Sequence, residues 1–149
     1  MRYARALSII AVLTVGSALP VRANVSFDFI GNTSLIVVPV IINGQGPYRF
    51  LFDTGANNTV LFTAVADSLK IPERRRALLI TAGGNLDVSV RVLRTLNVGG
   101  ARLEDIEIAV IDFDLMKTLK VDGVLGSDYL RRFRLVIDYD NKVIKIDPA

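Results

Sequence analysis

The alternation of apolar and polar positions predicts a domain built mainly of short strands. Val25, Phe27 and Phe29 alternate with polar residues, which is the two-residue period of a half-buried strand. A second run contains Pro39, which indicates an edge or a bulge there. The predicted strands are Val25–Phe29, Leu35–Ile42, Tyr48–Phe52, Leu78–Thr81, Val88–Leu93, a strand that ends at Val98, one that resumes near Leu103 and alternates to Val110, Arg134–Tyr139 and Lys142–Ile146.

Turn residues separate these strands, and two segments have helical spacing. The turn signals are Asn43–Gly46, Ala82–Asn85, Gly99–Gly100 and Asp140–Asn141. The first helix is predicted from Phe62 to Lys70 and the second from Ser127 to Phe133, with Ser127 or Gly126 near its N-cap. Many short strands, frequent turns and two short helices predict one all-β, barrel-like domain without internal repeats.

The first residues have the pattern of a targeting segment. Arg2 and Arg5 give a positive start, an apolar run extends from Ala6 to Leu19, and Pro20 ends any helix before the small-residue cleavage site Val21-Arg22-Ala23. The apolar run is short for a membrane span, which needs about 20 apolar residues. We therefore expect residues 1–23 to be a signal peptide and the protein to be exported, either periplasmic or secreted. The alternative is an N-terminal anchor that is not cleaved and holds the protein at the membrane.

Removal of this leader changes the charge balance of the chain. Three of its 18 Lys and Arg residues lie in residues 1–23, so residues 24–149 have 15 basic and 15 acidic residues and no formal net charge. The basic pI of the full chain is therefore no evidence for a nucleic-acid partner, and none is expected. After leader removal we expect no stable membrane association. The run Arg74-Arg75-Arg76 is interpreted as a solvated loop.

Two residue types are missing, and their absence excludes several kinds of active site. The sequence has no cysteine, so an exported domain must be stable without disulfides. It also has no histidine, which excludes a Ser-His-Asp triad, a Cys-His pair and a His-ligated zinc site. If the chain is a hydrolase, carboxylates or a Ser-Lys pair must carry the chemistry.

A carboxylate follows one of the apolar strands directly. Asp53-Thr54-Gly55-Ala56 comes after Phe50-Leu51-Phe52. A carboxyl group at the end of an apolar strand is partly desolvated and rigidly held, which suits acid–base chemistry. Thr54 can fix the loop by hydrogen bonding, and Gly55 allows a backbone or a substrate to approach. An ordinary turn at the strand end remains the alternative, because Asp, Thr and Gly all favour turns.

A second motif, Val121-Asp122-Gly123-Val124-Leu125-Gly126, places an apolar pair between glycines before the second predicted helix. The order of Asp53-Thr54-Gly55-Ala56, a glycine-tipped hairpin at Gly83-Gly84 and this second motif resembles the retropepsin-like aspartic peptidases. The chain is most similar in kind to their single-domain bacterial members, and the resemblance covers essentially all of residues 24–149.

The resemblance implies a role for each matching position. The fold would be a retropepsin-like acid-protease barrel with one lobe per chain, one or two short helices and a flap hairpin. Asp53 would be the catalytic residue, supported by Thr54, Gly55 and Ala56. Gly83 and Gly84 would form the substrate-binding flap. Gly123, Val124, Leu125 and Gly126 would form a strand that crosses behind the aspartate loop.

The same resemblance implies a homodimer that hydrolyses peptide bonds in peptide or protein substrates. Because each chain supplies one Asp-Thr-Gly, the catalytic pair would need Asp53 from two chains, with no metal or cofactor. The candidate dimer edges are the strands around Val25–Phe29 and Lys142–Ile146. A non-catalytic peptide-binding or dimerisation module of the same fold is the alternative.

The chain departs from the family pattern at two positions and offers two other carboxylates. Viral members often have an acidic residue and an arginine where this chain has Asn57 and Ser127, so both halves of an ion pair are missing together. Asp122 and Asp128 are alternatives for a second catalytic carboxylate within one chain, but neither follows an Asp-Thr-Gly pattern. Turn and capping roles are the favoured interpretation for both, and no metal site is expected.

Overall fold

The strands form two sheets, and the computed structural model describes residues 22–81, 84–112 and 118–148 of the chain. In chain order the elements are β1 (Ala23–Ser26), β2 (Asp28–Phe29), β3 (Ile36–Ile42), β4 (Gln45–Phe52), β5 (Val60–Phe62), α1 (Thr63–Ser68), β6 (Glu73–Thr81), β7 (Gly84–Val98), β8 (Ala101–Ile111), β9 (Gly123–Leu125), α3 (Ser127–Leu130), β10 (Phe133–Asp138) and β11 (Val143–Pro148). The strands dominate, as the sequence predicts, and the two helices are short.

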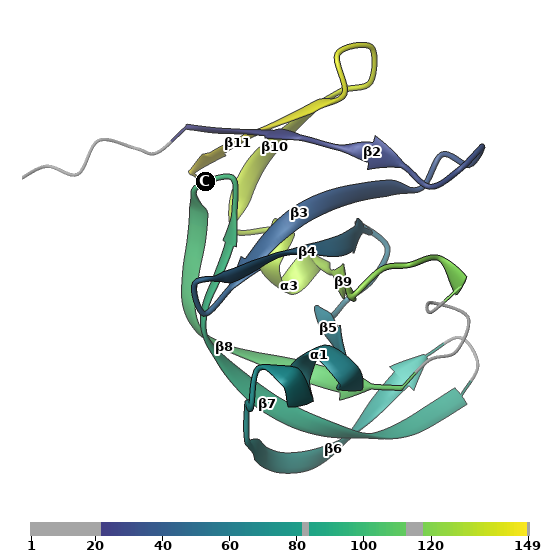
Figure 1. Cartoon of the computed structure of the whole chain (residues 1–149), viewed down its shortest axis with the longest axis vertical. Coiled ribbons are helices and arrows are strands. Elements are labelled where there is room, and N and C mark those ends of the chain that lie inside the picture. The colour runs from purple at the N-terminus through teal and green to yellow at the C-terminus, as the bar shows by residue number, and fades with distance from the viewer. Residues whose placement is uncertain (1–21, 82–83, 113–117, 149) are drawn as a thin grey trace, which may run out of the picture.

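Six of the strands close into a barrel. The larger sheet has the order β2-β3-β4-β9-β5-β8-β7-β6, and an additional pairing joins β3 to β7, the strands next to its two ends (Figure 1). The closed ring is therefore β3-β4-β9-β5-β8-β7. Alternate residues of these strands point inward, and Val38, Phe50, Leu61 and Leu93 are completely buried in the main core. The predicted all-β barrel is confirmed.

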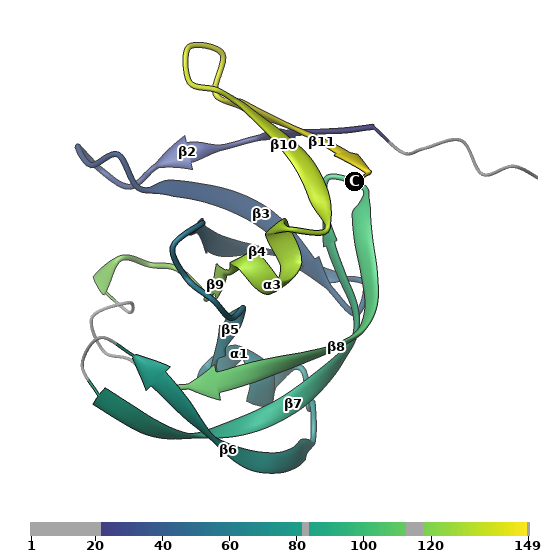
Figure 2. The ribbon, with the colours of Figure 1, turned by 180° about the vertical axis from the view of Figure 1, so that it is seen from behind.

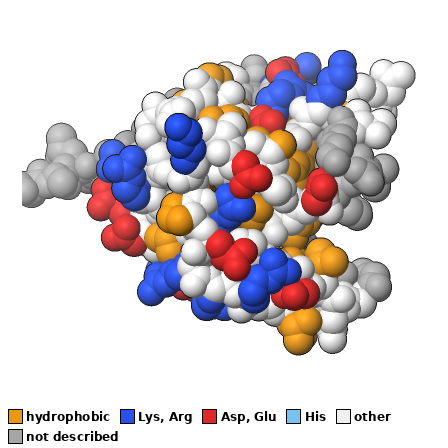
Figure 3. Space-filling view, turned by 60° about the horizontal axis from the view of Figure 1, so that its bottom comes forward, with side chains coloured by type: hydrophobic (Ala, Val, Ile, Leu, Met, Phe, Trp, Pro, Cys, Tyr) orange, Lys and Arg blue, Asp and Glu red, His pale blue; other side chains and the backbone are white. Residues whose placement is uncertain are grey.

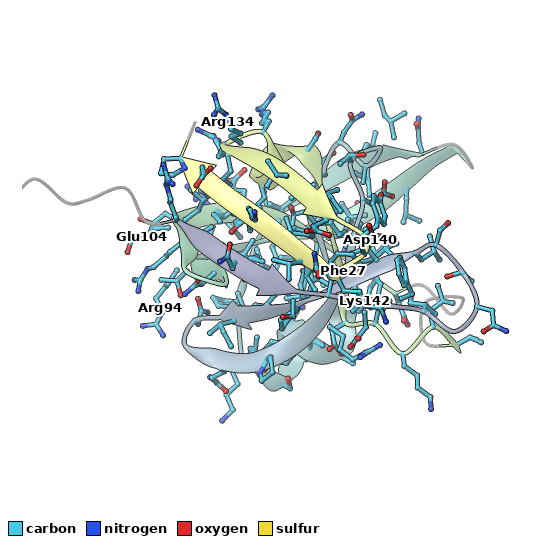
Figure 4. The ribbon with its side chains drawn as sticks, turned by 90° about the horizontal axis from the view of Figure 1, so that it is seen from above. Phe27, Arg94, Glu104, Arg134, Asp140 and Lys142 are labelled. Atoms are coloured by element: carbon cyan, nitrogen blue, oxygen red, sulfur yellow. The ribbon has the colours of Figure 1, made fainter. Side chains whose placement is uncertain are left out.

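A separate sheet, in the order β1-β11-β10, covers one side of the barrel (Figures 1 and 2). The predicted strand Val25–Phe29 is in fact two strands, because the chain changes sheets at Phe27. The Phe27 N–H still donates to the Lys142 carbonyl at 3.0 Å, whereas Asp28 and Phe29 pair with β3. Figure 4 shows this sheet from above, with Arg134 at one end of the β10–β11 hairpin and Asp140 and Lys142 at the other.

The place of β11 corrects one expectation. β11 pairs with β1 along one edge and with β10 along the other. The pairing with β10 covers the whole of Val143–Pro148. The predicted strand Lys142–Ile146 therefore offers no free edge to a second chain. Its two backbone edges are already hydrogen-bonded within the chain, and Ile144 and Ile146 are buried beneath it in the main core.

The first hairpin, β3–β4, follows the turn chemistry of its sequence. Ile42 pairs with Gln45, and the two residues between them, Asn43 and Gly44, have φ values of 51° and 80°. Positive φ at both central residues is the requirement of a type I′ turn, which explains the Asn-Gly pair. On one side Pro39 pairs with Arg49 of β4. On the other side it has no partner in β2, because the two residues of β2 pair with Ile36 and Val37. The predicted edge at Pro39 is thus a local gap in pairing, followed by a register shift between Val40 and Ile42.

Two segments differ from the prediction. The predicted helix Phe62–Lys70 is shorter in the structure. Phe62 is the last residue of strand β5, and α1 spans only Thr63–Ser68. The run Arg74-Arg75-Arg76, interpreted above as a loop, lies within β6. These arginines are exposed and pair with carboxylates on neighbouring strands: Arg75 with Glu107 at 2.8 Å and Arg76 with Asp87 at 3.0 Å.

The ion pairs of β6 leave a mixed surface on that side of the molecule. Arg75 lowers the pKa of the Glu107 carboxyl below its ordinary value, through a hydrogen bond and through its charge. Figure 3 brings this side forward and shows blue and red side chains next to one another. On this side of the molecule the described basic side chains of β6 are therefore paired with acidic ones.

Within the ranges that the structure describes, no helix is long and apolar enough to cross a membrane.

Candidate active site

The catalytic candidate Asp53 is placed by the burial of the strand before it. Phe50, Leu51 and Phe52 have exposed fractions of 0%, 7% and 8%, and β4 ends at Phe52. The strand lies between β3 and β9: Leu51 pairs with Val37 of β3 and the last residue, Phe52, pairs with Leu125 of β9. Asp53 is the first residue after it and is half-buried. The backbone of the carboxylate is therefore rigidly placed, while its side chain keeps access to solvent.

Hydrogen bonds hold the Asp53 loop in one conformation. The Asp53 N–H donates to the Leu125 carbonyl at 3.1 Å, and the Gly55 N–H donates to Asp53 Oδ1 at 2.8 Å. The Ala56 N–H donates to the Asp53 carbonyl at 3.3 Å, which closes the turn. A backbone N–H that donates to a carboxylate fixes its orientation. Thr54 and Gly55 are exposed at the tip of the loop.

The second motif lies where the resemblance places it, directly behind the Asp53 loop. β9 runs parallel to β4, with Gly123 opposite Phe50 and Leu125 opposite Phe52, and antiparallel to β5. This close approach explains both glycines. A Cβ at Gly123 would lie 2.4 Å from the Val60 carbonyl oxygen, and one at Gly126 would lie 2.5 Å from the Asn58 carbonyl oxygen. Neither position has room for a side chain.

Thr59 and Asp128 form a buried polar link that the sequence reasoning did not single out as a pair. The Thr59 N–H donates to both Asp128 oxygens at 2.9 Å, and Thr59 Oγ1 donates to Asp128 Oδ1 at 2.7 Å. Thr59 Oγ1 in turn accepts the Gly126 N–H at 3.1 Å. Asp128 Oδ1 also accepts the Tyr129 N–H at 2.8 Å, but it does not cap α3, whose N-cap is Gly126 and which has no side-chain cap hydrogen bond. The link ties the end of the catalytic loop to α3.

Backbone hydrogen bonds replace the ion pair that is missing at Asn57 and Ser127. The Ser127 N–H donates to the Ala56 carbonyl at 2.8 Å, and the Asp128 N–H donates to the Asn57 carbonyl at 3.2 Å. Ser127 Oγ adds a bond to the same Asn57 carbonyl at 3.3 Å. At Asn57 and Ser127 the loop and α3 are therefore joined by uncharged groups, beside the Thr59–Asp128 link.

Asp122 lies at the other end of the second motif. Its Oδ2 accepts the Arg49 N–H at 2.7 Å, and its own N–H donates to the Arg49 carbonyl at 2.7 Å. Gly123, the next residue, is opposite Phe50, three residues before Asp53. Three strand residues span about 10 Å, so Asp122 is bound at the middle of β4 and not at the carboxylate itself.

The predicted flap is a long hairpin of β6 and β7. The two strands pair continuously from Arg75 to the pair Thr81–Gly84, and Gly84 has a φ of 115°. Gly83 lies outside the described residues, so only half of the predicted tip is seen. A Cβ at Gly84 would meet nothing within 4 Å.

One face of this hairpin turns toward the second motif. Leu79 packs in a second apolar cluster with Val60 of β5 and Val124 of β9. The opposite face carries Leu78 and Ile80, which are 69% and 82% exposed. An apolar inner face therefore joins the flap to the strands that flank the Asp53 loop.

The comparisons with known proteins agree with this geometry. A family model described as aspartyl protease matches residues 38–129. No curated sequence matches the chain at a significant level. Among solved structures, a retropepsin-like aspartic protease from Rickettsia conorii is 19% identical with a TM-score of 0.59, covering 87% of this chain and 92% of the other.

Two further structures are similar. The EIAV protease, solved with an inhibitor, is 25% identical with a TM-score of 0.52, covering 70% of this chain and 92% of that chain. The retroviral protease-like domain of Ddi1 from Leishmania major is 19% identical with a TM-score of 0.53, covering 78% and 94%. The family match includes Asp53, the flap hairpin and the second motif, and the chain belongs to the aspartyl protease family, with a retropepsin-like fold.

Proposed function

We propose that the protein is an aspartic endopeptidase whose catalytic pair consists of Asp53 from two chains. The observation that carries the proposal is the position of Asp53. Asp53 follows a buried strand, its carboxylate accepts the Gly55 N–H at 2.8 Å, and its backbone N–H donates to the Leu125 carbonyl of β9 at 3.1 Å. This is a rigid carboxylate in an Asp-Thr-Gly loop of an aspartyl protease fold.

The reaction would follow from two such carboxylates held close together. Two carboxyl groups about 3 Å apart cannot both ionise easily, so they share one proton. The charged carboxylate takes a proton from a bound water, and the protonated one donates a hydrogen bond to the scissile carbonyl. Water attacks the carbonyl carbon, and the tetrahedral intermediate collapses when a carboxyl group protonates the leaving nitrogen. No metal or covalent intermediate takes part in this scheme.

The carboxylates that could complete the pair within one chain are engaged elsewhere. Asp122 is bonded to the Arg49 backbone in the middle of β4, and both oxygens of Asp128 accept from Thr59. A second copy of the chain supplies the missing group most simply, because it brings an identical Asp53 loop. Thr54, exposed beside Asp53, would contact its counterpart across the two-fold axis.

The flap hairpin would complete the peptide site. Its inner face is apolar at Leu79 and lies against Val60 and Val124. A hairpin that closes over an extended peptide excludes water from the reacting bond. The substrate would therefore be an extended segment of a peptide or protein.

Substitution of Asp53 by Asn tests this function. Incubation of the wild-type protein with a mixed peptide library at acidic and neutral pH should give internal cleavage products, detected by mass spectrometry. Asp53→Asn should abolish them while the fold and dimer persist, because removing one charge from a like-charge pair does not destabilise it. Asp140→Asn, on the exposed β10–β11 turn, is the matched control and should cleave normally.

Two results would overturn the assignment. Cleavage at the wild-type rate by Asp53→Asn would move the chemistry to another carboxylate. Peptide binding without cleavage by the wild-type protein would instead support the non-catalytic module.

We also propose that the chain is exported after removal of residues 1–23. The supporting observation is the basic start, the short apolar run and the small-residue site that ends at Ala23. Cleavage there would leave Asn24, the second residue of β1, at the new N-terminus. Mass spectrometry of the exported protein should show Asn24 first, and a membrane-bound product that keeps Met1 would contradict the proposal.

A further inference from the structure

Arg75 lies on the inner face of the flap hairpin. Arg75, Ala77 and Leu79 share this face of β6, because side chains alternate between the two faces of a strand. Leu79 packs there against Val60 of β5 and Val124 of β9. Arg75 therefore points to the side of the hairpin on which a peptide would bind, and the function proposed above gives it no role.

A β-bulge brings Arg74 to the same side. β6 advances two residues, from Glu73 to Arg75, while β7 advances one. An extra residue of this kind bends a strand and re-aims a side chain. From this bend both arginines reach one carboxylate of β8: Glu107 lies 3.6 Å from Arg74 Nη1 and 2.8 Å from Arg75 Nη2.

The charges around the arginine run balance overall but not on each face of the hairpin. On the inner face two guanidinium groups share the single carboxylate of Glu107. On the outer face the one guanidinium of Arg76 lies between two carboxylates, Asp87 at 3.0 Å and Glu73 at 3.8 Å. Within this cluster the inner face therefore keeps one positive charge in excess.

A small pocket lies beside the inner-face arginines. Its polar lining consists of Asn58, Arg75 and Glu107, and apolar side chains such as Leu79 and Ala109 form its walls. They come from β6 and β8, which flank β7 in the sheet (Figure 1). The pocket has a volume of about 170 Å³, whereas sites for whole small molecules have about 300 to 1,000 Å³. It therefore suits a single side chain of a longer ligand.

Asn58 places this pocket beside the catalytic loop. It belongs to the same β4–β5 connection as Asp53 and directly precedes Thr59, whose buried link ties that end of the loop to α3. The wall residues Leu79 and Ala109 belong to the apolar cluster that also contains β9. A peptide held in extended form between the flap and Asp53 would therefore pass the pocket.

The groups in the pocket favour an acidic side chain. A guanidinium has five N–H groups, of which Arg75 uses one in its 2.8 Å hydrogen bond to Glu107, and charge-assisted bonds to carboxylates are strong. Asn57 and Asn58 on the loop side are amides and bring no opposing negative charge. A basic side chain would find Glu107 already shared by two arginines. The apolar walls can contact methylene groups, which favours glutamate over the shorter aspartate.

We propose that this inner-face cluster, Arg74, Arg75 and Glu107 with Asn58, binds an acidic side chain of the substrate. In the proposed dimer the pocket occurs once in each chain, so the preference applies at one position on either side of the scissile bond. The inference rests on the proposed function, because the substrate must lie between the flap and Asp53. It names the class of substrate, peptides with glutamate near the cleavage site, which the paired carboxylates alone leave open.

Cleavage of a positional-scanning peptide library tests the preference. Each position in turn carries Glu, its uncharged isostere Gln, or Lys within otherwise randomised peptides. At the position that enters the pocket, kcat/KM should be about fivefold higher for Glu than for Gln, as expected for a solvent-accessible charge-assisted contact. The ratio should fall toward one in about 1 M salt, where the Debye length is about 3 Å.

Stepwise removal of the two guanidinium groups tests which residues cause the preference. Arg75→Gln leaves the cluster neutral and should bring the ratio of Glu to Gln close to one. Arg74→Gln/Arg75→Gln leaves Glu107 as its only charge, so Lys should become the preferred residue at that position. Each ratio is taken within one variant, so a change in overall activity cancels. Far-UV circular dichroism checks that each variant is folded.

Arg76→Gln is the matched control, because Arg76 follows Arg75 on the same strand and forms its ion pairs on the outer face. Its ratio should stay at the wild-type value. An unchanged ratio in the double variant, or an equal loss in Arg76→Gln, would overturn the pocket.

Binding to the Asp53→Asn variant separates this proposal from the peptidase itself. Fluorescein-labelled pools of the same library, with Glu or Gln fixed at one position, report binding by anisotropy without cleavage. If the wild-type protein cleaves no peptide, but the Glu pool binds more tightly and loses this advantage when Arg74→Gln/Arg75→Gln is added, the pocket stands and the peptidase fails. Cleavage through Asp53 without any acidic preference refutes the pocket alone. Neither cleavage nor preferential binding refutes both.

Discussion

Thr59 is the residue on which the candidate active site depends most after Asp53. It is 1% exposed, and its hydroxyl donates to Asp128 while it accepts the Gly126 N–H. One side chain thus holds three segments that are far apart in sequence: the end of the catalytic loop, the second motif and α3. A buried network of this kind is stabilising only when each member is satisfied.

Thr59→Val tests the network at this scale. Valine has a similar shape but cannot accept the Gly126 N–H, which is buried. Leaving a buried donor unpaired costs about 1 to 3 kcal/mol of the free energy of unfolding. Urea denaturation should show a loss of that size, with peptide turnover also reduced because the catalytic loop loses its support.

Thr33→Val is the matched control for this prediction. Its hydroxyl donates to the Ile30 carbonyl in an exposed turn, where water replaces the bond. Its effect should stay within about 0.5 kcal/mol. Equal losses in the two variants would show that the Thr59 link has no special role.

Sequence reasoning identified individual residues of the candidate site more readily than the residues to which they are hydrogen-bonded. Asp53, Gly55, Gly123 and Gly126 were all identifiable, because each obeys a local rule of turn or close approach. The Thr59–Asp128 link was not, since the two residues are separated by 69 positions and only the fold brings them together. The signal that could have found it is a polar residue, Thr59, directly before the apolar run Val60–Phe62.

At the scale of elements, apolar periodicity located most strands but failed where two elements follow without a turn. α1 follows β5 without a turn, so the apolar residues from Val60 to Leu69 do not indicate where the strand ends and the helix begins. The arginine run of β6 failed for a different reason. Its charges are neutralised across the sheet by Glu107 and Asp87, and these pairings depend on a strand register that the local sequence does not contain.

The flap gives the prediction that belongs to this scale. Gly84 has a φ of 115°, a conformation that residues with a Cβ rarely adopt. Gly84→Val should therefore shift the hairpin tip and lower peptide turnover several-fold, by about 1 kcal/mol of transition-state binding. The melting temperature should fall only modestly, because a Cβ at this position meets no neighbouring atom within 4 Å and the cost is limited to the backbone strain of that φ.

Gly31→Val supplies the control for the flap. Gly31 also has positive φ, 52°, and open space for a Cβ, but it lies in the turn between β2 and β3, away from the β6–β7 hairpin. It should match Gly84→Val in melting temperature and keep wild-type turnover. Normal turnover in both variants would make the hairpin a structural element only.

At the scale of the whole molecule, the barrel could be predicted but the use of its edges could not. Short strands and frequent turns indicated a barrel, and the Asp53 motif and the second motif indicated a barrel of the retropepsin-like kind. Whether a strand is central or peripheral is a property of the complete sheet order. Lys142–Ile146 has the same apolar alternation as β10, yet β11 lies in the middle of its sheet and β10 at the edge. No local pattern distinguishes the two.

Dependence on concentration is the prediction that concerns the molecule as a whole. One Asp-Thr-Gly supplies one carboxylate, and the proposed reaction needs two in opposite protonation states. Below the dimer dissociation constant, specific activity should therefore fall in proportion to the protein concentration, and sedimentation should show monomer over the same range. If the wild-type protein is monomeric and its specific activity stays constant at the lowest concentrations, then a single chain must contain both carboxylates. Asp122 and Asp128 would then have to leave the hydrogen bonds that now hold them.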